Sequence, residues 1–356
     1  MKKFIYIAAA ALAAAACAQN EVTEVTPSEE TPICFETAPI TKGHTEFDHK
    51  YVFQSAAWYL EPVTAPATEA KTWEKNFAEG VKYIPESTVS YMTSVWRTEK
   101  NYYWPKNGGT LSFYSWSLNK DNLNFTNTAT TVTIDQEKGV VVNNYDVTIE
   151  KNTDFIVADP ALDKKVNEHK YYTDGVPTLF RHKLSKMSVT AQTKEDYAKD
   201  GKTITIKNIK VTNVVKEADF QECEENSTSN LWTVIDQWTS SEDKYDATYS
   251  STDTEVTNTQ VTIGGEQTVY IPQDFTGDEI LEITYEVYDE YSKVKETITF
   301  KIPLKDALQS SSSAKDGKFE PGKQYTINLT FTLDLVYWDP AVEDWEVNNK
   351  PVTVGE

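Results

Sequence analysis

The segment QYTINLTFTLDL, residues 324–335, constrains the fold most strongly because apolar and polar residues alternate along its whole length. Successive side chains of a β-strand point to opposite faces of the sheet, so this alternation predicts a long, half-buried strand. The segment 292–302 repeats the pattern, and in TITIKNIKV the phase slips at Lys207 and Asn208, which predicts a β-bulge there. The predicted buried face of the first segment consists of Tyr325, Ile327, Leu329, Phe331, Leu333 and Leu335.

Few segments have helical periodicity, and the turn residues fit strands. The segments 68–77 and 306–312 could each hold a turn or two of helix. Asn-Gly-Gly at 107–109 and Gly-Gly at 264–265 each separate two apolar, strand-like runs, which predicts two β-hairpins. We therefore expect an all-β protein.

The length of the chain predicts two domains, because the 340 residues that follow residue 16 exceed a single β-sandwich. The polar stretch 159–177 is the best boundary, and we place an N-terminal sandwich at 33–170. A C-terminal sandwich at 171–356 would end in a strand-like tail. The stretch 221–258 is rich in Ser, Thr, Asp and Glu and lacks the Asp-x-Asp-x-Asp-Gly spacing of calcium loops, so we predict a long solvated insertion.

The first residues predict export. Lys2 and Lys3 precede an apolar segment of thirteen residues, Phe4 to Ala16, which is too short to span a bilayer and is typical of a signal peptide, 1–16. Cleavage could be that of plain secretion, or it could precede Cys17, whose LAAAAC context resembles a bacterial lipobox. We favour acylation of Cys17, because multiple acyl chains hold a protein on a membrane. Residues 17–32, rich in Thr, Glu and Pro, would then be a disordered tether.

The charge of the chain excludes one class of partner. Removal of residues 1–16 takes away two lysines and no acids, which leaves 32 basic and 55 acidic residues, a net charge of −23. Such a surface repels nucleic acid and anionic headgroups. Cys34 and Cys223 are 189 residues apart without a spacing pattern, so they are more typical of separate small hydrophobes, and their pairing stays open.

No catalytic or cofactor motif is present in the sequence. The four histidines are not in a His-Glu-x-x-His pattern, and the chain has neither a Gly-x-Ser-x-Gly elbow nor a phosphate-binding glycine loop. Carboxylate pairs of the glycosidase type stay open among 55 acids. One aromatic cluster could be a sugar-stacking platform, but its alternation favours a sandwich core. Its members are Trp96, Tyr102, Tyr103, Trp104, Phe113, Tyr114 and Trp116.

Six segments together resemble the fimbrillins, pilus subunits of Gram-negative oral and gut anaerobes that are assembled from lipoprotein precursors. They occur in the family's order across most of the mature chain. The resemblance implies two tandem transthyretin-like β-sandwich domains, and a mechanism in which a protease removes an early strand and a strand of the next subunit fills the groove. The segments are ICFETAPITK (33–42), YYWPKNGGTLSFYSWS (102–117), DFIVADP (154–160), VPTLFRHKLSKMSVTAQ (176–192), YIPQDF (270–275) and FEPGKQYTINLTFTLDLVYWDPAVEDW (319–345).

The resemblance also implies which strand is replaceable. It would run from Ile33 to Ile40, with Ile33 and Phe35 facing inward and Cys34 and Glu36 facing outward. A sandwich that lacks one strand exposes an unsatisfied backbone edge and an apolar trench, which a neighbour's strand can fill.

The processing site departs from the family's pattern. Members are often cut after arginine, but this chain has only Arg97 and Arg181, both within predicted domain structure. Lys42 before Gly43 is the candidate site, with a solvated loop lysine as the alternative. The candidate donor is the C-terminal tail, with Trp338, Val342, Trp345, Val347, Val352 and Val354 as plugs.

Our leading hypothesis is a structural, non-enzymatic pilus component that contributes to adhesion, as shaft or anchor subunit. It would be exported, reach the outer membrane as a lipoprotein, and polymerise with other pilus subunits, without nucleic acid or a cofactor. Its position in the pilus and its receptor stay open. The alternative hypothesis is a monomeric surface lipoprotein that binds glycans through exposed aromatic side chains.

Overall fold

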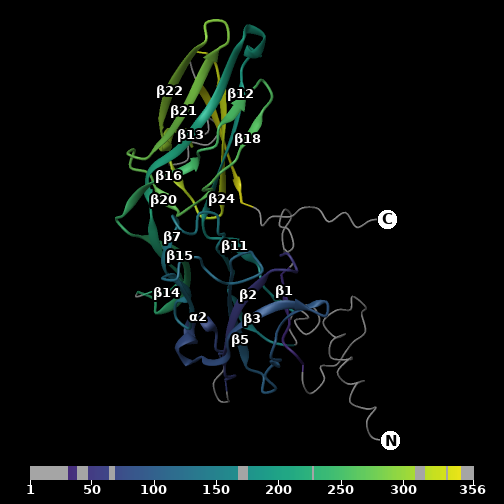
Figure 1. Cartoon of the computed structure of the whole chain (residues 1–356). Helices are drawn as coiled ribbons and strands as arrows, with labels where there is room; N and C mark the ends of the chain where they lie inside the picture. Colours follow the sequence, from purple (N-terminus) through teal and green to yellow (C-terminus); the bar gives the residue numbers. More distant parts are fainter. Residues whose placement is uncertain are drawn as a thin grey trace, which may run out of the picture.

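The computed structural model describes residues 31–37, 47–63, 69–166, 175–226, 228–308, 317–333 and 336–345. They form two lobes stacked end to end, which we call the lower and upper lobes as they stand in Figure 1. Strands dominate both lobes, and among the described residues helix is limited to α2 (Trp73–Asn76), the 3-10 turns η1 (Phe77–Glu79) and η2 (Tyr197–Asp200), and α3 (Leu304–Ala307). The all-β prediction is therefore confirmed, whereas the tandem transthyretin-like arrangement stays a prediction.

A large rolled sheet forms most of the lower lobe. Its strand order is β10-β1-β4-β3-β2-β5-β8-β11, and β9 also pairs with β5. The two end strands are separated in sequence only by Thr178 and Leu179, so one continuous stretch of chain meets both edges and the sheet curls toward closure. The strands are β1 (Phe35–Glu36), β2 (Val52–Leu60), β3 (Val81–Met92), β4 (Val95–Thr98), β5 (Thr110–Ser117), β8 (Ile156–Ala158), β9 (Ala161–Lys164), β10 (Val176–Pro177) and β11 (Phe180–His182).

A second sheet covers one face of the rolled sheet. Its order is β15-β14-β7-β6, from β6 (Thr131–Asp135), β7 (Gly139–Asp146), β14 (Glu217–Asn226) and β15 (Leu231–Ser240). One core cluster, with Trp58, Tyr114 and Phe220, lies between the two sheets, and a second, with Phe35, Phe53 and Phe113, lies inside the curl. Adjacent residues of β5 serve different cores, because alternate side chains leave a strand on opposite faces.

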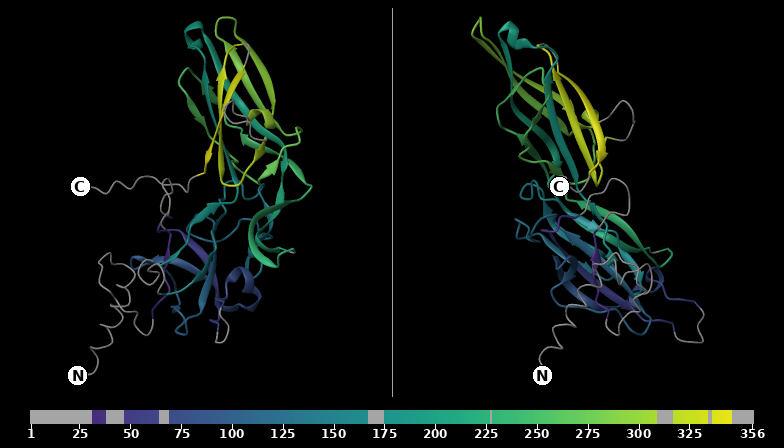
Figure 2. Two further views of the ribbon diagram at one scale, coloured as in Figure 1. Left: turned by 180° about the vertical axis from the view of Figure 1, so that it is seen from behind. Right: turned by 90° about the vertical axis from the view of Figure 1, so that its right-hand side faces the viewer.

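The upper lobe is a sandwich of two sheets, which the right-hand view of Figure 2 shows as two layers. One sheet has the order β18-β12-β24-β25, with β19 also paired to β12; the other has the order β16-β13-β21-β22, with β17 also paired to β13. Between them lies a core with Val189, Ile209 and Leu329. The strands are β12 (Ser185–Thr193), β13 (Lys202–Val215), β16 (Lys244–Ser250), β17 (Thr254–Val256), β18 (Val261–Ile263), β19 (Val269–Tyr270), β21 (Ile280–Asp289), β22 (Val294–Pro303), β24 (Lys323–Phe331) and β25 (Val336–Asp344), and β20 (Gln273–Asp274) pairs with β23 (Lys318–Phe319).

The strongest sequence patterns predicted local structure correctly. In β24 the inward residues Tyr325, Ile327, Leu329 and Phe331 are at most 4% exposed, although the strand ends at Phe331. The register of β13 with β21 shifts between Ile206 and Asn208, where the bulge was predicted. Both short helices lie within or beside the segments that have helical periodicity.

The predicted hairpins are wrong, because each flanking segment has a distant partner. Backbone groups of Tyr102 and Trp104 bond to Ile33 and Thr31, while β5 pairs with β2. Strands β18 and β19 both pair with β12. A local turn signal fixes a change of direction, but tertiary pairing decides which strands meet.

The predicted loop at 221–258 is also wrong, since the structure has most of β14 and all of β15, β16 and β17 there. Apart from the buried Glu222, its Glu residues and its Thr residues lie on the solvent side of strands whose buried side includes Trp232 and Tyr249. The many acidic residues of this stretch obscured the alternation of apolar and polar residues that is typical of strands. In addition, β14 pairs with β7, so this hairpin belongs to the lower lobe's second sheet.

Candidate strand-exchange site

The first strand occupies a seat between β4 and β10. Phe35 pairs antiparallel with Trp96 of β4 and parallel with Val176 of β10. Upstream, the N–H of Ile33 donates to the Tyr102 carbonyl at 2.8 Å. The segment therefore has backbone partners on both of its sides, although only two of its residues count as strand.

Further backbone bonds line both edges of the seat. The N–H of Trp104 donates to the Thr31 carbonyl at 2.9 Å, and Pro32 forms a bridge with Tyr103. On the other edge, Val176 donates to the Cys34 carbonyl and Thr178 to the Glu36 carbonyl, both at 2.7 Å. Loss of the first strand would leave these groups of the seat without partners.

Two apolar side chains plug the seat, as predicted. Ile33 is 3% and Phe35 is 4% exposed. The Phe35 ring packs edge-on against Phe53 and Phe113, with centroids 5.5 and 5.9 Å apart. Full burial of two such side chains contributes about 3–6 kcal/mol in total.

Cys34 differs from the prediction, because it is only 4% exposed although it alternates with the inward residues. Cys223 is a free, buried thiol in the lower-lobe core, so it does not pair with Cys34. Burial raises the pKa of the Cys223 thiol.

Gly175 lets β10 approach the first strand closely. Its φ of +93° lies in the left-handed region, and a Cβ at this position would lie 2.7 Å from the backbone carbon of Phe35 and 3.0 Å from the N of Glu36. Real Cβ atoms do not come so close to backbone, so only glycine fits without a shift of the strand. Gly175 was not predicted as a site residue, and the only signal for it in the sequence was its place in a turn-like Asp-Gly pair.

The C-terminal strand lies at the edge of an upper-lobe sheet. Strand β25 pairs antiparallel with β24 over nine residues, and the two run side by side in Figure 2. The register sets Trp338 opposite Leu329 and Val342 opposite Tyr325. Within the described residues no strand pairs with the other edge of β25. An edge strand has one unpaired row of backbone groups and can be exchanged more readily than a central strand.

Trp345 follows β25 and leaves the sheet. Its N–H donates to the Gly322 carbonyl at 2.8 Å, and its ring packs against the lower-lobe core. Several predicted site residues lie outside the described residues, namely Cys17, Ile40, Lys42, Gly43, Val347, Val352 and Val354. Arg97 and Arg181 both lie within strands, β4 and β11.

Most of the aromatic cluster belongs to the core, as its alternation indicated. Trp96, Trp104, Phe113, Tyr114 and Trp116 are at most 6% exposed, and Tyr102 is half-buried. Tyr103 alone of the seven is an exposed side chain, at 38%. The cluster therefore offers no exposed stacking platform.

Glu222 is a buried carboxyl that the sequence analysis did not single out. It is 1% exposed, and its Oε2 accepts a hydrogen bond from the Val140 N–H at 2.8 Å. Burial raises its pKa to about 8, so the carboxyl is mostly protonated at neutral pH. It follows the buried Ala218 and Phe220 at alternate positions of β14, so it lies on the inward face of the strand, directly before Cys223 where the β14–β15 register shifts.

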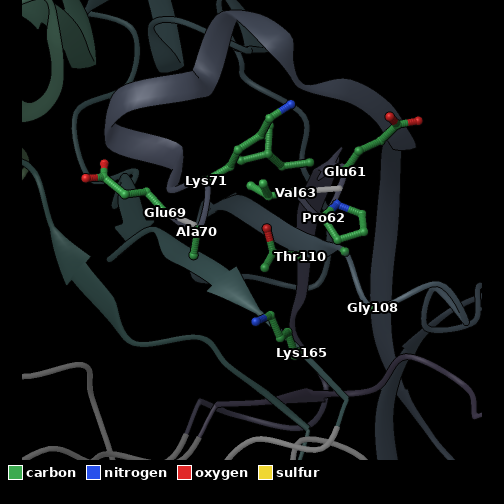
Figure 3. A pocket seen from close by; sticks show the side chains of 11 residues that line it. Glu61, Pro62, Val63, Glu69, Ala70, Lys71, Gly108, Thr110 and Lys165 are labelled. Carbon is green, nitrogen blue, oxygen red and sulfur yellow. The ribbon is translucent and has the colours of Figure 1, made fainter. Parts of the chain in front are cut away.

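A polar surface pocket of about 290 Å³ lies in the lower lobe (Figure 3). Lys71, Thr110 and Lys165 line it, and the Lys71 ammonium pairs with Glu79 at 2.6 Å. Among the described residues that line it there is no serine, cysteine or histidine. Over the described residues, no cluster of three or more His, Cys, Asp or Glu could hold a metal ion, and no helix has the length and apolarity to cross a membrane.

The fold and the two strand ends define a structural type, an all-β protein with a short first strand seated in an apolar groove and a last strand at a sheet edge. A family model described as fimbrillin-like matches residues 62–345, which is most of the chain. The chain belongs to the fimbrillin-like family. A search of curated proteins gave no significant match.

Among solved structures similar to this chain, the first one below shares its fold. A fimbrial protein from Bacteroides vulgatus is 14% identical with a TM-score of 0.57, over 82% of this chain and 92% of that one. A putative cell adhesion protein from Bacteroides uniformis is 14% identical with a TM-score of 0.47, over 90% and 100% of the two chains. A similar protein from Bacteroides ovatus is 14% identical with a TM-score of 0.40, over 91% and 100%.

Proposed function

We propose that this chain is a subunit of a cell-surface pilus, a shaft or anchor subunit that joins its neighbours by strand exchange and contributes to adhesion. Membership of the fimbrillin-like family supports the pilus role. The observation that carries the exchange mechanism is the seat of the first strand, a short segment with backbone partners on both edges and two buried apolar plugs. Its role would be structural rather than enzymatic.

The proposed sequence of events begins with the monomer. The first strand fills its own seat, and β25 is docked on its own β24, which is the arrangement expected before exchange. An attached first strand competes at very high effective concentration, so an uncut precursor should stay monomeric. Proteolysis in the loop near Lys42 would open the seat and make the switch one-way.

The free energy gained on strand exchange depends on the apolar side chains that a donor strand would bury in the seat. Five such side chains at roughly 1.5–3 kcal/mol each give an upper bound of about 8–15 kcal/mol before ordering costs. The tail offers apolar residues at alternate positions of β25, paired opposite the buried face of β24. Export by the signal peptide and acylation of Cys17 would bring the precursor to the outer membrane.

Mass spectrometry of the native N-terminus tests this proposal, together with imaging of surface fibres by an antibody against this chain. A mature chain that begins near Gly43 in labelled fibres would support a shaft subunit. Acylated Cys17 at the base of fibres would support an anchor. Acylated Cys17 on cells whose fibres never carry the chain would reject the pilus role.

The glycan-binding alternative has little support, because five of the seven aromatic side chains on which it rested are buried in the core. An exposed Tyr103 does not make a stacking platform.

A further inference from the structure

The end of the C-terminal strand crosses from one lobe to the other. Strand β25 belongs to the upper-lobe sheet, and its first residue, Val336, is 4% exposed in the upper-lobe core. Trp345, directly after the strand, packs against the core of the lower lobe. The two ends of this edge strand are therefore fixed in different lobes.

His182 forms the platform on which Trp345 lies. The two rings stack with centroids 3.9 Å apart and an angle of 7° between their planes. His182 is 5% exposed, and its Nδ1 contacts the Asp154 Oδ1 at 2.8 Å. Its Nε2 is buried and has no hydrogen-bond partner among the described residues. The Lys186 ammonium also lies over the Trp345 ring, 5.5 Å from its centroid.

This platform lies at one of the connections between the lobes. The chain passes from β11 to β12 through residues 183 and 184. Two basic side chains in or beside this connection form ion pairs with acidic side chains of the lower lobe. Arg181 pairs with Asp159 at 2.8 Å, and the buried Lys183 pairs with Asp236 at 2.7 Å. A connection held in this way is a rigid support for a stacked ring.

We propose that Trp345 is an intramolecular latch, which keeps β25 on its own β24 and so holds the donor tail back from other subunits. This inference rests on the proposed role of the tail in strand exchange. A nine-residue edge strand frays from its free end, and the stacked ring closes that end. The neighbouring ion pair, Lys323 with Asp344, adds little because the Asp344 side chain is 82% exposed.

The same contact between Trp345 and His182 also contains a feature that favours opening, the unpaired Nε2 of His182. An unpaired, buried polar atom is unfavourable, and the Nε2 of His182 would gain a water partner when the Trp345 ring moves away. Stacking on the imidazole and burial of the ring favour the closed state, while hydration of Nε2 favours the open one. The tail is thus held firmly enough to stay docked in the monomer and can still be released.

Hydrogen exchange of the full-length monomer tests the latch without any need for fibres. In Trp345→Ala, the amides of β24 and β25 should exchange about tenfold faster or more, while those of β13 and β21 stay unchanged. Tyr337→Ala is the matched control, because Tyr337 lies on the same strand and is 51% exposed. Its β25 amides should exchange within about twofold of the wild-type rate.

A double-mutant cycle with His182→Ala shows whether the two rings act together. His182→Ala should speed the same amides, and the double variant should be no faster than Trp345→Ala alone. If either alanine variant fails to fold, Trp345→Phe, which keeps a ring, is measured, and the latch predicts an intermediate rate. Wild-type exchange of β25 in Trp345→Ala, or independent effects of the two substitutions, would overturn the latch. If exchange rises as expected but the freed tail never pairs with a subunit that lacks residues 31–37, the latch stands and the donor role fails.

Discussion

The buried carboxyl of Glu222 makes a quantitative prediction about stability and pH. The carboxyl is 1% exposed and accepts one hydrogen bond, from the Val140 N–H, while its Oε1 has no partner among the described residues. Burial is the largest cause of its raised pKa, about 8 in the folded chain against an ordinary 4.5. The folded state therefore binds a proton that the unfolded chain releases.

The sign of the effect follows from proton linkage. The protonated carboxyl is tolerated in the core, so the contribution of Glu222 to stability is greatest below pH 4.5 and is lost as the pH rises toward 8. A difference of one pKa unit corresponds to about 1.4 kcal/mol, so this contribution to the free energy of unfolding should fall by about 5 kcal/mol across this window. At pH 7 the loss should be about 3 kcal/mol.

Glu222→Gln removes this dependence, because an amide stays neutral at every pH and its oxygen can still accept the Val140 N–H. Urea denaturation at pH 5, 6, 7 and 8 gives the free energy of unfolding of each variant. The variant should be slightly less stable than wild type at pH 5, since it buries an extra N–H, and more stable by about 3 kcal/mol or more at pH 8. Glu224→Gln, at an exposed position of the same strand, is the control. A difference between Glu222→Gln and wild type that does not change with pH would refute the reasoning.

Three further predictions concern the strands of the candidate site. Leu329→Asp places a charge in the upper-lobe core and should cost several kcal/mol, seen as a lost or strongly lowered thermal transition, whereas Thr330→Asp on the outer face should melt near wild type. Gly175→Ala should loosen the first strand, seen as faster proteolysis within residues 31–37, whereas Gly264→Ala has open space around it and should not. Deletion of 336–356 should leave a folded chain that cannot donate to a neighbour, and electron microscopy that shows normal fibres from this truncation would rule out the tail as donor.

Sequence patterns predicted those parts of the fold that depend on local alternation. Tyr325 to Phe331 alternate perfectly and form a strand with that face buried. Glu222 was missed because the stretch 221–258 was predicted to be a solvated loop, although Glu222 alternates with Ala218 and Phe220 on the inward face of β14. Gly175 was missed for a different reason, since its close contact with Phe35 joins segments 140 residues apart.

In the candidate site, too, the inward-facing residues could be predicted from the local sequence, whereas the neighbouring strands could not. Ile33 and Phe35 are inward, as their spacing and the family resemblance indicated. Which strands form the seat could not be read from the sequence, because β4 and β10 lie about 60 and 140 residues further along the chain. The role of Trp345 also depends on a distant partner, His182, that only the packed lobes bring beneath its ring.

The backbone bonds of the seat restrict which register a donor strand could adopt. The seat uses an N–H at the position of Ile33 and carbonyls at the positions of Thr31, Cys34 and Glu36. Proline has no N–H, so the register that sets Pro340 of the tail at the position of Ile33 would lose the bond to the Tyr102 carbonyl and leave that oxygen without its partner. A shift by one residue would avoid this loss but would turn the alternate apolar residues of the tail to the other face of the sheet. A productive register must therefore keep the apolar residues at the positions of Ile33 and Phe35 while it sets Pro340 away from the position of Ile33.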